Sequence, residues 1–289
     1  MDNKQMNIQW YPGHMTKTRR QIEADLKLVD AVCEIVDARI PVSSRNPDID
    51  AICGNKPRII VLNRMDLADP NATKVWLDHF RKMGIAAVAT DCKSKKGVSG
   101  FQPAVRSVLK EKIARNAAKG MNKPVRVMIV GIPNVGKSTF INQISGRKGA
   151  KAENRPGVTR GKQWVTVYNG LLLLDTPGIL WPKFEDPMVG MMLAFTGAVK
   201  ENVIDVEELA CHLMEHMLKY YPAALENRYG VTAPEMTPGY ELLEMAGKKR
   251  GYLVSGGEIN TERMAKVLLD EYRAGKLGKF TLEMPEEQQ

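Results

Sequence analysis

The chain has 289 residues, 44% of them hydrophobic, which is enough for two domains with separate cores. Its four cysteines are scattered without a Cys-x-x-Cys pair, and no apolar run reaches about 18 residues, which argues against a disulfide-stapled scaffold, a zinc site and a membrane span. The net charge of +9 and the lack of a secretion signal favour a cytoplasmic protein with an anionic partner.

Helical and strand patterns alternate in the first half of the chain. In chain order, the sequence predicts a helix over 16–28, a strand over 31–36, a short helix near 47–53, a strand over 59–62, a helix over 72–83, a strand over 85–89 and one helix over 103–119. Strands that alternate with helices indicate a mostly parallel sheet covered on both faces. We therefore expect an α/β domain.

The segment Asn63-Arg64-Met65-Asp66 follows the second of these strands. It is similar to the guanine-reading Asn-Lys-x-Asp motif, with Arg64 in place of lysine. The carboxylate of Asp66 can accept both the N1–H and the N2–H of guanine, which adenine does not offer. The aliphatic stem of Arg64 can still cover the base. An Asn and an Asp after a strand can also cap a helix, and the segment alone leaves both interpretations open.

The third strand is followed by Thr90-Asp91-Cys92, where the last base-contacting loop is expected. The usual Ser-Ala-Lys sequence is absent from this loop, so Asp91 and Cys92 are assigned as base-contacting residues by position only.

Basic residues are concentrated in two stretches. Residues 93–126 contain ten lysines and arginines against one acid, Glu111, and residues 147–162 contain six against Glu153. A basic stripe beside a nucleotide switch suits an RNA backbone as partner. The alternative is a solvated helix face over a buried apolar stripe, which would consist of Val105, Val108, Leu109 and Ile113.

A phosphate-binding motif occupies Gly131–Ser138 (GIPNVGKS), between an expected strand over 125–130 and a helix over 138–144. In a P-loop of this form, backbone N–H groups wrap the α- and β-phosphates, the lysine reaches the β- and γ-phosphate oxygens, and the serine hydroxyl ligates Mg²⁺. We expect Lys137 and Ser138 to have these two roles.

Two further segments complete the pattern of a triphosphate site. Thr159 lies in a loop broken by Gly and Pro and can complete the coordination of Mg²⁺. After expected strands over 164–168 and 171–174, Asp175-Thr176-Pro177-Gly178 resembles a D-x-x-G motif, in which the Asp holds a Mg²⁺-bound water and the Gly N–H senses the γ-phosphate. The next residue, Ile179, cannot hydrogen-bond a water, so unaided hydrolysis should be slow.

The order of these motifs is reversed, because the base motif precedes the P-loop. This order predicts a circularly permuted Ras-like G domain over 1–185. Helical patterns then follow over 188–198, 205–221, 223–229, 238–247 and 260–274. They predict an all-α domain over 186–282 that binds RNA or the ribosome, and a tail over 283–289. Because the D-x-x-G loop leads directly into the all-α domain, we hypothesise that GTP fixes the relative placement of two RNA-binding surfaces.

With these motifs the chain resembles the circularly permuted bacterial GTPases, most closely the ribosome biogenesis GTPase A family. Shared segments also include Trp10–Met15 (WYPGHM), Asp37–Pro41 (DARIP) and Ser43–Pro47 (SSRNP), and the resemblance covers nearly the whole chain. It implies a cytoplasmic, monomeric GTPase that acts in late maturation of the large (50S) ribosomal subunit and is stimulated by that subunit.

The resemblance also implies roles for two single residues. His14 would position the attacking water, unless it is an ordinary surface or capping histidine. Asn134 would ligate a K⁺ that replaces an arginine finger, unless it makes only a backbone hydrogen bond in its loop.

Together, these motifs predict one nucleotide site. GTP or GDP is expected to contact Asn63, Arg64, Met65, Asp66, Asp91, Cys92, Asn134, Val135, Gly136, Lys137, Ser138, Thr139, Thr159 and Gly178. The expected Mg²⁺ ligands are Ser138, Thr159 and, through water, Asp175; Asn134 is the candidate K⁺ ligand and His14 the catalytic residue.

Two other functions remain open on the sequence alone. A P-loop ATPase or kinase would keep Lys137 and Asp175 but would leave Asp66 without a role. An RNA-binding module that is stiffened by nucleotide, with little turnover, would fit Ile179.

Overall fold

The computed structural model describes the chain from residue 14 onward, with side chains from residue 16. The residues described are 14–146, 163–167, 170–181, 184, 186–199 and 205–285. They form two compact units. The helical unit is Phe184–Leu282, and the sheet unit contains the described residues before it together with residues 283–285.

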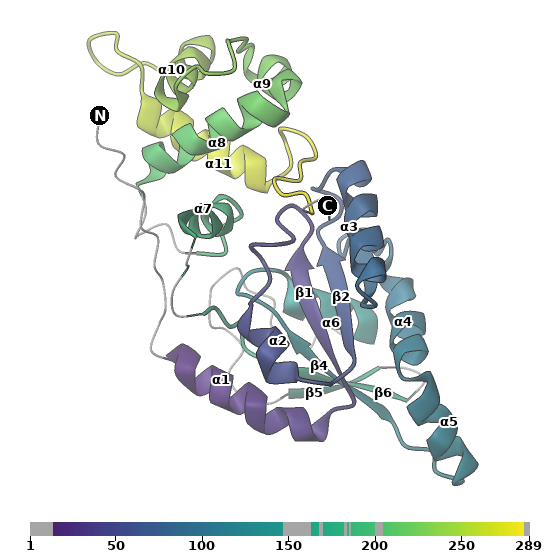
Figure 1. Ribbon diagram of the computed structural model, residues 1–289. Coiled ribbons are helices and arrows are strands. Elements are labelled where there is room, and N and C mark those ends of the chain that lie inside the picture. The colour runs from purple at the N-terminus through teal and green to yellow at the C-terminus, as the bar shows by residue number, and fades with distance from the viewer. Residues whose placement is uncertain are drawn as a thin grey trace. The chain divides into compact units, whose positions relative to one another are not determined.

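A six-stranded sheet lies at the centre of the sheet unit (Figure 1), with the strand order β3-β2-β1-β4-β6-β5. The strands are β1 (Ala31–Asp37), β2 (Arg58–Asn63), β3 (Ala86–Thr90), β4 (Val125–Val130), β5 (Gln163–Val167) and β6 (Leu171–Asp175). Neighbouring strands are parallel except for β5 and β6, which are antiparallel. The predicted α/β class with a mostly parallel sheet is confirmed.

The spatial order of the strands brings early and late parts of the chain together. The P-loop follows β4, which pairs with β1 on one side and with β6 on the other. The strand that leads to the base motif, β2, is therefore separated from β4 by β1 alone. Motifs that are far apart in the chain thus begin at the ends of strands with only one strand between them, as expected of a permuted chain.

Strand register aligns the carboxyl ends of three strands. Asp37 at the end of β1 pairs with Asn63 at the end of β2, which pairs with Thr90 at the end of β3. Every residue of β1 and all but the first of β2 are buried, because both faces of these parallel strands are covered. The polar residues at this edge are therefore held by a rigid sheet.

Helices pack on both sides of the sheet. The helices of the sheet unit are α1 (His14–Asp25), α2 (Asp48–Cys53), α3 (Pro70–Lys82), α4 (Phe101–Val108), α5 (Lys110–Ala118) and α6 (Lys137–Ser145), with 3-10 turns at Leu26–Leu28 and Val98–Gly100. Trp76 and Phe80 of α3 pack on Ile60 and Leu62 of β2. The β2 residues that alternate with these two face the other side of the sheet, where α4 contacts β2. On that side α4 also contacts α6, because the ring centroids of Phe101 and Phe140 are 5.1 Å apart.

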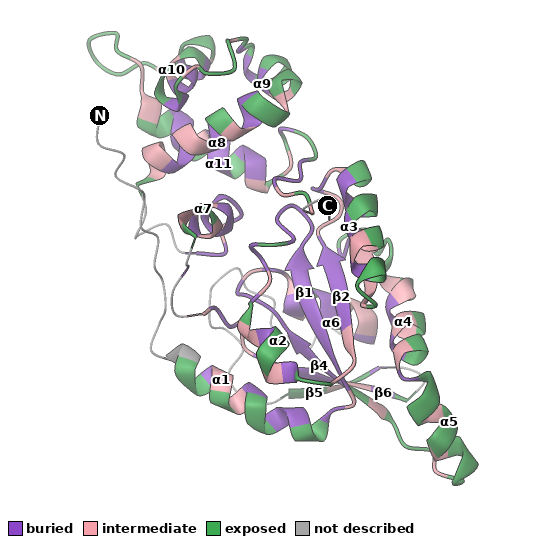
Figure 2. Cartoon of the chain, in the orientation of Figure 1, coloured by how far each residue is buried: buried purple, intermediate pink, exposed green. Residues whose placement is uncertain are grey.

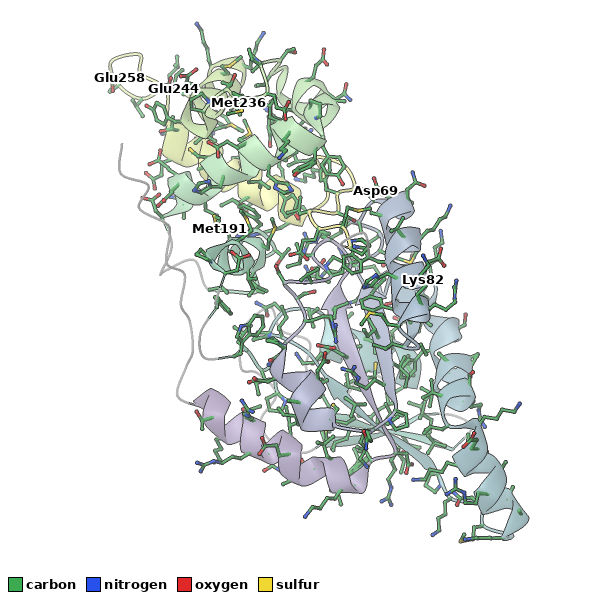
Figure 3. The ribbon with its side chains drawn as sticks, viewed as in Figure 1. Asp69, Lys82, Met191, Met236, Glu244 and Glu258 are labelled. Carbon is green, nitrogen blue, oxygen red and sulfur yellow. The ribbon has the colours of Figure 1, made fainter. Side chains whose placement is uncertain are left out.

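The start of α3 is fixed by a side-chain cap. The carboxylate of Asp69, labelled at the beginning of this helix in Figure 3, accepts hydrogen bonds from the backbone N–H groups of Asn71 and Ala72, and Pro70 occupies the first helical position. This is the favoured chemistry of a helix N-terminus.

The single helix predicted over 103–119 is wrong in one respect: the structure has two helices, α4 and α5, with a turn at Leu109. Val105 and Leu109 are buried as expected, but Val108 and Ile113 are only half-buried. Figure 1 shows α5 running past the ends of the strands. No residue of α5 is buried, so the buried apolar stripe ends at the turn.

The helical unit contains α7 (Pro187–Phe195), α8 (Val206–Tyr220), α9 (Pro222–Tyr229), α10 (Gly239–Lys249) and α11 (Thr261–Arg273). Its core is formed mainly by α8, α10 and α11, which contribute the fully buried Leu213, Leu242 and Leu268. Helix α10 approaches α8 closely at Gly239, where an added Cβ would lie 2.3 Å from the carbonyl oxygen of Cys211. Among the described residues, no helix has the length and apolar content needed to cross a bilayer.

Candidate nucleotide-binding site

The P-loop connects β4 to α6 and adopts backbone conformations that suit its glycines and asparagine. Gly131 has φ 149°, and a Cβ there would lie 2.5 Å from the carbonyl oxygen of Ile35 in β1. Gly136 has φ 98°, and Asn134 has φ 59°, a left-handed conformation that asparagine tolerates better than most residues. The loop ends at the amino end of α6, where backbone N–H groups favour bound phosphate.

Lys137 is a buried cation without a carboxylate at ion-pair distance in the described part of the chain. It is 7% exposed, and its Nζ donates hydrogen bonds to the carbonyl oxygens of Gly131 (3.0 Å) and Ile132 (2.7 Å). Burial lowers the pKa of Lys137, and the nearby charge of Asp175 partly opposes that shift. A phosphate oxygen would supply the missing counter-charge, so Lys137 fits the role expected of it.

Asp175 is the last residue of β6, and one of its buried carboxylate oxygens accepts no hydrogen bond from the described residues. It is 2% exposed, and its Oδ1 has no hydrogen-bond partner among the described residues. Burial raises the pKa of Asp175, and Lys137 acts in the opposite direction. A buried carboxylate oxygen without a donor is costly unless a ligand satisfies it. A Mg²⁺-bound water would do so, and the half-buried Ser138 in the first turn of α6 offers a hydroxyl to the same ion.

The segment after Asp175 is fixed against the P-loop. The hydroxyl of Thr176 donates to the carbonyl oxygen of Ile129 at 2.7 Å. At Gly178 an added Cβ would lie 2.8 Å from Pro133 Cα and 3.0 Å from Lys137 Nζ. Only glycine fits between the loop and the lysine, which is the position required of a residue that senses the terminal phosphate.

Ile179 is buried. Its side chain is 1% exposed, its N–H donates to the carbonyl oxygen of Gly131 (3.2 Å), and its carbonyl oxygen accepts from Asn46 Nδ2 (3.4 Å). The prediction that this residue cannot orient water is consistent with its burial. Another group must do so.

Asn63 joins the base motif to the P-loop. Its Nδ2 donates to the carbonyl oxygen of Val135 at 2.9 Å, and its Oδ1 accepts from Thr90 Oγ1 and from Cys92 Sγ, each at 3.2 Å. A Cβ on Gly136 would lie 2.3 Å from Asn63 Nδ2, so the two loops touch. The side chain is 3% exposed, and these three hydrogen bonds connect it to the P-loop and to the end of β3.

Arg64 makes a second bridge between the same loops. Its backbone has φ 60°, its Nη2 donates to the carbonyl oxygen of Asn134 at 2.6 Å, and its Nη1 lies 3.8 Å from Asp37 Oδ2. Asp37 also forms a buried bidentate pair with Arg39, at 2.9 and 2.8 Å. Although burial raises the pKa of Asp37, Arg39 and Arg64 together lower it by more, and the net shift is downward, so the carboxylate stays charged.

The remaining base-site candidates lie at the same edge. The half-buried Asp66 makes no hydrogen bond through its carboxylate within the described residues, and Met65 is tied by its N–H to the carbonyl oxygen of Thr90 at 3.1 Å. Burial raises the pKa of the Cys92 thiol to about 11, and the charges of Asp91 and Asp66 add to this shift, so the thiol is neutral. Asp91 instead closes its own turn, because its carboxylate accepts from the N–H of Lys93 at 2.8 Å.

The remaining predicted residues are either placed on the P-loop and α6 or lie outside the described part of the chain. Thr139 is exposed on the first turn of α6 and Val135 is buried in the P-loop. Thr159 and the side chain of His14 lie outside the described residues, as do residues 147–162 with their basic stretch.

Three supporting residues of the site are missing from the set predicted by motif: Asp37, Asn46 and Thr90. Asp37 and Asn46 belong to the DARIP and SSRNP segments, and Thr90 is the last residue of β3. The sequence therefore indicates these segments, but spacing cannot identify the partners of the three residues. Strand register brings Asp37 and Thr90 level with Asn63, and a loop contact brings Asn46 to Ile179.

Known proteins are similar to this chain over nearly its full length. A family model described as "50S ribosome-binding GTPase" matches residues 126–233. Ribosome biogenesis GTPase A of Priestia megaterium (strain DSM 319 / IMG 1521) is 49% identical over 285 residues, covering 98% of each chain. The protein of that name from Thermotoga maritima is 33% identical over 280 residues, covering 97% of this chain and 95% of the relative.

Solved structures agree with these relatives. A GDP-bound structure of TM YlqF has a TM-score of 0.66 and 28% identity, covering 93% of this chain and 100% of that one. A GNP-bound structure of YlqF from T. maritima has a TM-score of 0.65 and 28% identity, covering 94% and 100%. The resemblance inferred from the permuted motifs is confirmed: the chain belongs to the ribosome biogenesis GTPase A family.

Proposed function

We propose that this protein hydrolyses GTP while it acts in late assembly of the large ribosomal subunit. The observation that supports this best is the contact of Asn63 Nδ2 with the carbonyl oxygen of Val135, 2.9 Å, which joins a guanine-type motif to a P-loop that follows it in the chain. A nucleotide bound there would be held at its base by one loop and at its phosphates by the other.

Each end of the nucleotide has its own residues. At the phosphates, the P-loop N–H groups and Lys137 bind oxygens, and the N–H of Gly178 contacts the terminal phosphate when it is present. At the base, the free carboxylate of Asp66 accepts from guanine N1–H and N2–H, which selects GTP over ATP. Ser138, Asp175 through water, and Thr159 would hold Mg²⁺, which neutralises charge on the phosphates when it is bound.

Two single residues, His14 and Asn134, complete the proposed mechanism. His14 would position the attacking water, since Ile179 is buried and cannot. Asn134 would hold a K⁺ beside the phosphates. Its carbonyl oxygen is engaged by Arg64, which fixes the residue while it lies in the left-handed region.

The partner in this proposal is the large ribosomal subunit, reached by a monomer in the cytoplasm. Family membership and the net charge of +9 support a ribosomal partner. Binding to the assembled subunit is then expected to raise turnover above the slow unaided rate.

The decisive experiment measures both nucleotide competition and the rate of GTP turnover. We expect GTP and GDP, but not ATP, to displace a fluorescent GDP, and we expect purified large subunits to increase multiple-turnover GTP hydrolysis, more in K⁺ than in Na⁺. Equal displacement by ATP would contradict the guanine assignment. Turnover that subunits leave unchanged would contradict the proposed partner.

The His14→Ala variant tests the water-positioning role. It should bind GTP like the wild type but lose the increase in kcat that subunits produce. A variant with unchanged stimulated kcat would remove His14 from the mechanism.

A further inference from the structure

Helix α5 has no buried residue. Of its nine residues, only Ile113 and Asn116 are partly buried, and the rest are exposed, as the mainly green helix in Figure 2 shows. Helices of globular proteins usually bury one face. A projecting helix without such a face needs a different reason for its composition.

The charges on and after α5 are basic and mostly unpaired. Lys110, Arg115, Lys119 and Lys123 are exposed and form no ion pair within the described part of the chain. Lys112 alone is paired, with Asp30 before β1. A merely solvated helix face usually intersperses acids with its cations, but here Glu111 is the one acid among residues 110–123.

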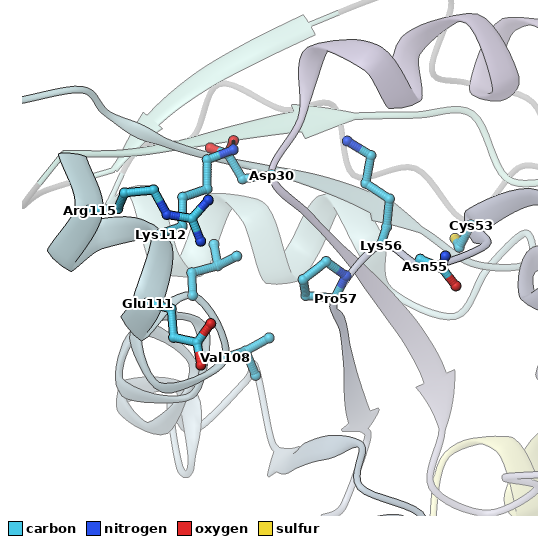
Figure 4. A pocket seen from close by; sticks show the side chains of 10 residues that line it. Asp30, Cys53, Asn55, Lys56, Pro57, Val108, Glu111, Lys112 and Arg115 are labelled. Carbon is cyan, nitrogen blue, oxygen red and sulfur yellow. Dashed lines mark hydrogen bonds and ion pairs between the residues drawn. The ribbon is translucent and has the colours of Figure 1, made fainter.

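Two hollows flank the base of α5. The larger, about 490 Å³, is lined by three cations, two acids and Asn55 among its polar residues (Figure 4): Lys56, Lys112, Arg115, Asp30 and Glu111. The smaller, about 150 Å³, includes Arg106, Lys123, Asn116 and Asn122. Both share Asp30, Leu109 and Lys112, and amide side chains in each add neutral hydrogen-bonding groups to the cations.

This surface lies at the edge of the sheet opposite to the nucleotide site. Its lining residues Asp30 and Pro57 immediately precede β1 and β2, and Val125 and Gly170 begin or precede β4 and β6. Most of the basic stretch over 93–126 therefore does not lie beside the nucleotide site, whereas the stretch over 147–162 lies outside the described residues. Of the ten lysines and arginines over 93–126, only Lys93, Lys95 and Lys96 follow the carboxyl end of a strand. The others lie on α4, on α5, between α5 and β4 or at the start of β4.

We propose that the α5 surface, defined as Lys110, Arg115, Lys119 and Lys123 with the two hollows, binds the phosphate backbone of ribosomal RNA in both nucleotide states. The proposal rests on the function proposed above. Exposed cations beside hollows that offer both polar and apolar groups fit the phosphates and riboses of RNA. An acidic protein fits less well, because protein interfaces need apolar anchors and no exposed large hydrophobic residue lies on α5 or over 119–126.

The test is the triple variant Arg115→Gln, Lys119→Gln, Lys123→Gln in the full chain. The matched control removes three exposed lysines elsewhere on the sheet unit: Lys17→Gln, Lys27→Gln, Lys74→Gln. Binding to large subunits, and to protein-free rRNA extracted from them, is measured across a salt series with GDP and with a non-hydrolysable GTP analogue. Equal melting temperatures and GDP affinities establish that both variants are folded.

We expect the α5 variant to bind at least about tenfold more weakly at low salt. The slope of log K against log salt should fall in magnitude by about 0.7 to 0.9 for each RNA phosphate that the variant no longer neutralises. The effect should be equal with both nucleotides, and the control should match the wild type.

An unchanged slope would overturn the proposal. So would weaker binding to whole subunits without weaker binding to free rRNA, which would identify a ribosomal protein as the partner, or an effect confined to one nucleotide. Wild-type protein that fails to bind subunits at all would instead contradict the proposed function itself.

Discussion

At the residue scale, the nucleotide site depends on side chains that connect separate loops. Asn63 and Arg64 are adjacent in sequence, yet both reach backbone carbonyl oxygens of the P-loop, at Val135 and Asn134. Arg64 additionally lies beside Asp37, which is itself paired with Arg39. The arginine at this position therefore reaches two partners through two separate nitrogens, whereas a lysine would have a single nitrogen for both.

Arg64→Ala should weaken GDP binding by about tenfold or more, because a hydrogen bond from a charged group contributes about 1.5–3 kcal/mol and the P-loop would lose one of its two ties. Arg64→Lys should retain most of the affinity by keeping one of the two contacts. Titration with a fluorescent GDP measures both. Arg81→Ala, at an exposed ion pair with Asp78 on α3, is the control. An Arg64→Ala variant that binds GDP like this control would exclude the bridging role.

Gly178→Ala should slow GTP hydrolysis at least about tenfold while it changes GDP affinity little. The added methyl group would collide with the backbone of Pro133 and approach Lys137, so the segment that senses the terminal phosphate must move. Single-turnover kinetics and GDP titration separate the two effects. Gly100→Ala is the control, since its Cβ would meet only Val88 Cγ1 at 3.7 Å. Wild-type rates for Gly178→Ala would show that this packing is not needed.

At the scale of elements, the helical unit is held together by a polar centre as well as by its apolar core. Glu271 on α11 accepts hydrogen bonds from Arg228 and Tyr229 at the end of α9, and Arg250 after α10 lies 3.6 Å away. The hydrogen bond from Arg228 is the main reason that the pKa of Glu271 is lowered, although burial opposes the shift. One carboxylate therefore connects three helices.

Glu271→Gln should lower the free energy of unfolding at pH 7 by about 1–3 kcal/mol, a range reduced for the partial exposure of Arg228. Because the folded-state pKa of Glu271 lies below the unfolded value, its contribution is present above about pH 4.3 and is lost as pH falls through the lower, folded value. The free energies of urea unfolding of wild type and variant should therefore converge as the pH falls through the folded-state pKa of Glu271. Glu262→Gln, at an exposed pair on the same helix, should cost less than about 0.5 kcal/mol at either pH. A difference that persists unchanged at the acidic end would contradict the assignment.

At the scale of the whole molecule, the chain leaves the sheet unit before Phe184 and returns to it at Glu283. The carboxylate of Glu283 accepts from the N–H groups of Val42 (2.7 Å) and Ser43 (3.0 Å) and from the Ser43 hydroxyl, and its carbonyl oxygen accepts from Trp76 Nε1 at 2.9 Å. The helical unit is thus an insertion with both of its ends connected to the sheet unit. The loop that receives Glu283 also contains Asn46, which contacts Ile179 after the D-x-x-G segment.

Glu283→Ala should release this connection and increase hydrogen exchange at the amides of Val42 and Ser43 by at least about tenfold, since they lose a charged acceptor. Exchange within β1 should stay unchanged and serves as the internal control. Unaltered exchange at both amides would show that another group protects them.

The connection of both ends bears on the hypothesis that nucleotide state controls the arrangement of the two units. Under this hypothesis, small-angle scattering of the full chain should differ between GDP and a GTP analogue, because a movement of Gly178 would be transmitted along the chain to the helical unit. Identical scattering in the two states, free and on the ribosomal subunit, would refute this coupling.

The sequence by itself determined the motifs, their reversed order, and with them the mostly parallel sheet and the family. These features are local: a P-loop needs its glycines and lysine at fixed spacing, and the pattern of alternating strands and helices is set by neighbouring residues. Tertiary structure alone decided which distant groups meet. The partners of Arg64, the return of Glu283 and the contact of Asn46 with Ile179 join residues 70, 241 and 133 positions apart. The turn at Leu109, and hence the exposed α5, also depended on where the sheet ends, because an apolar stripe is buried only where another layer is present to cover it.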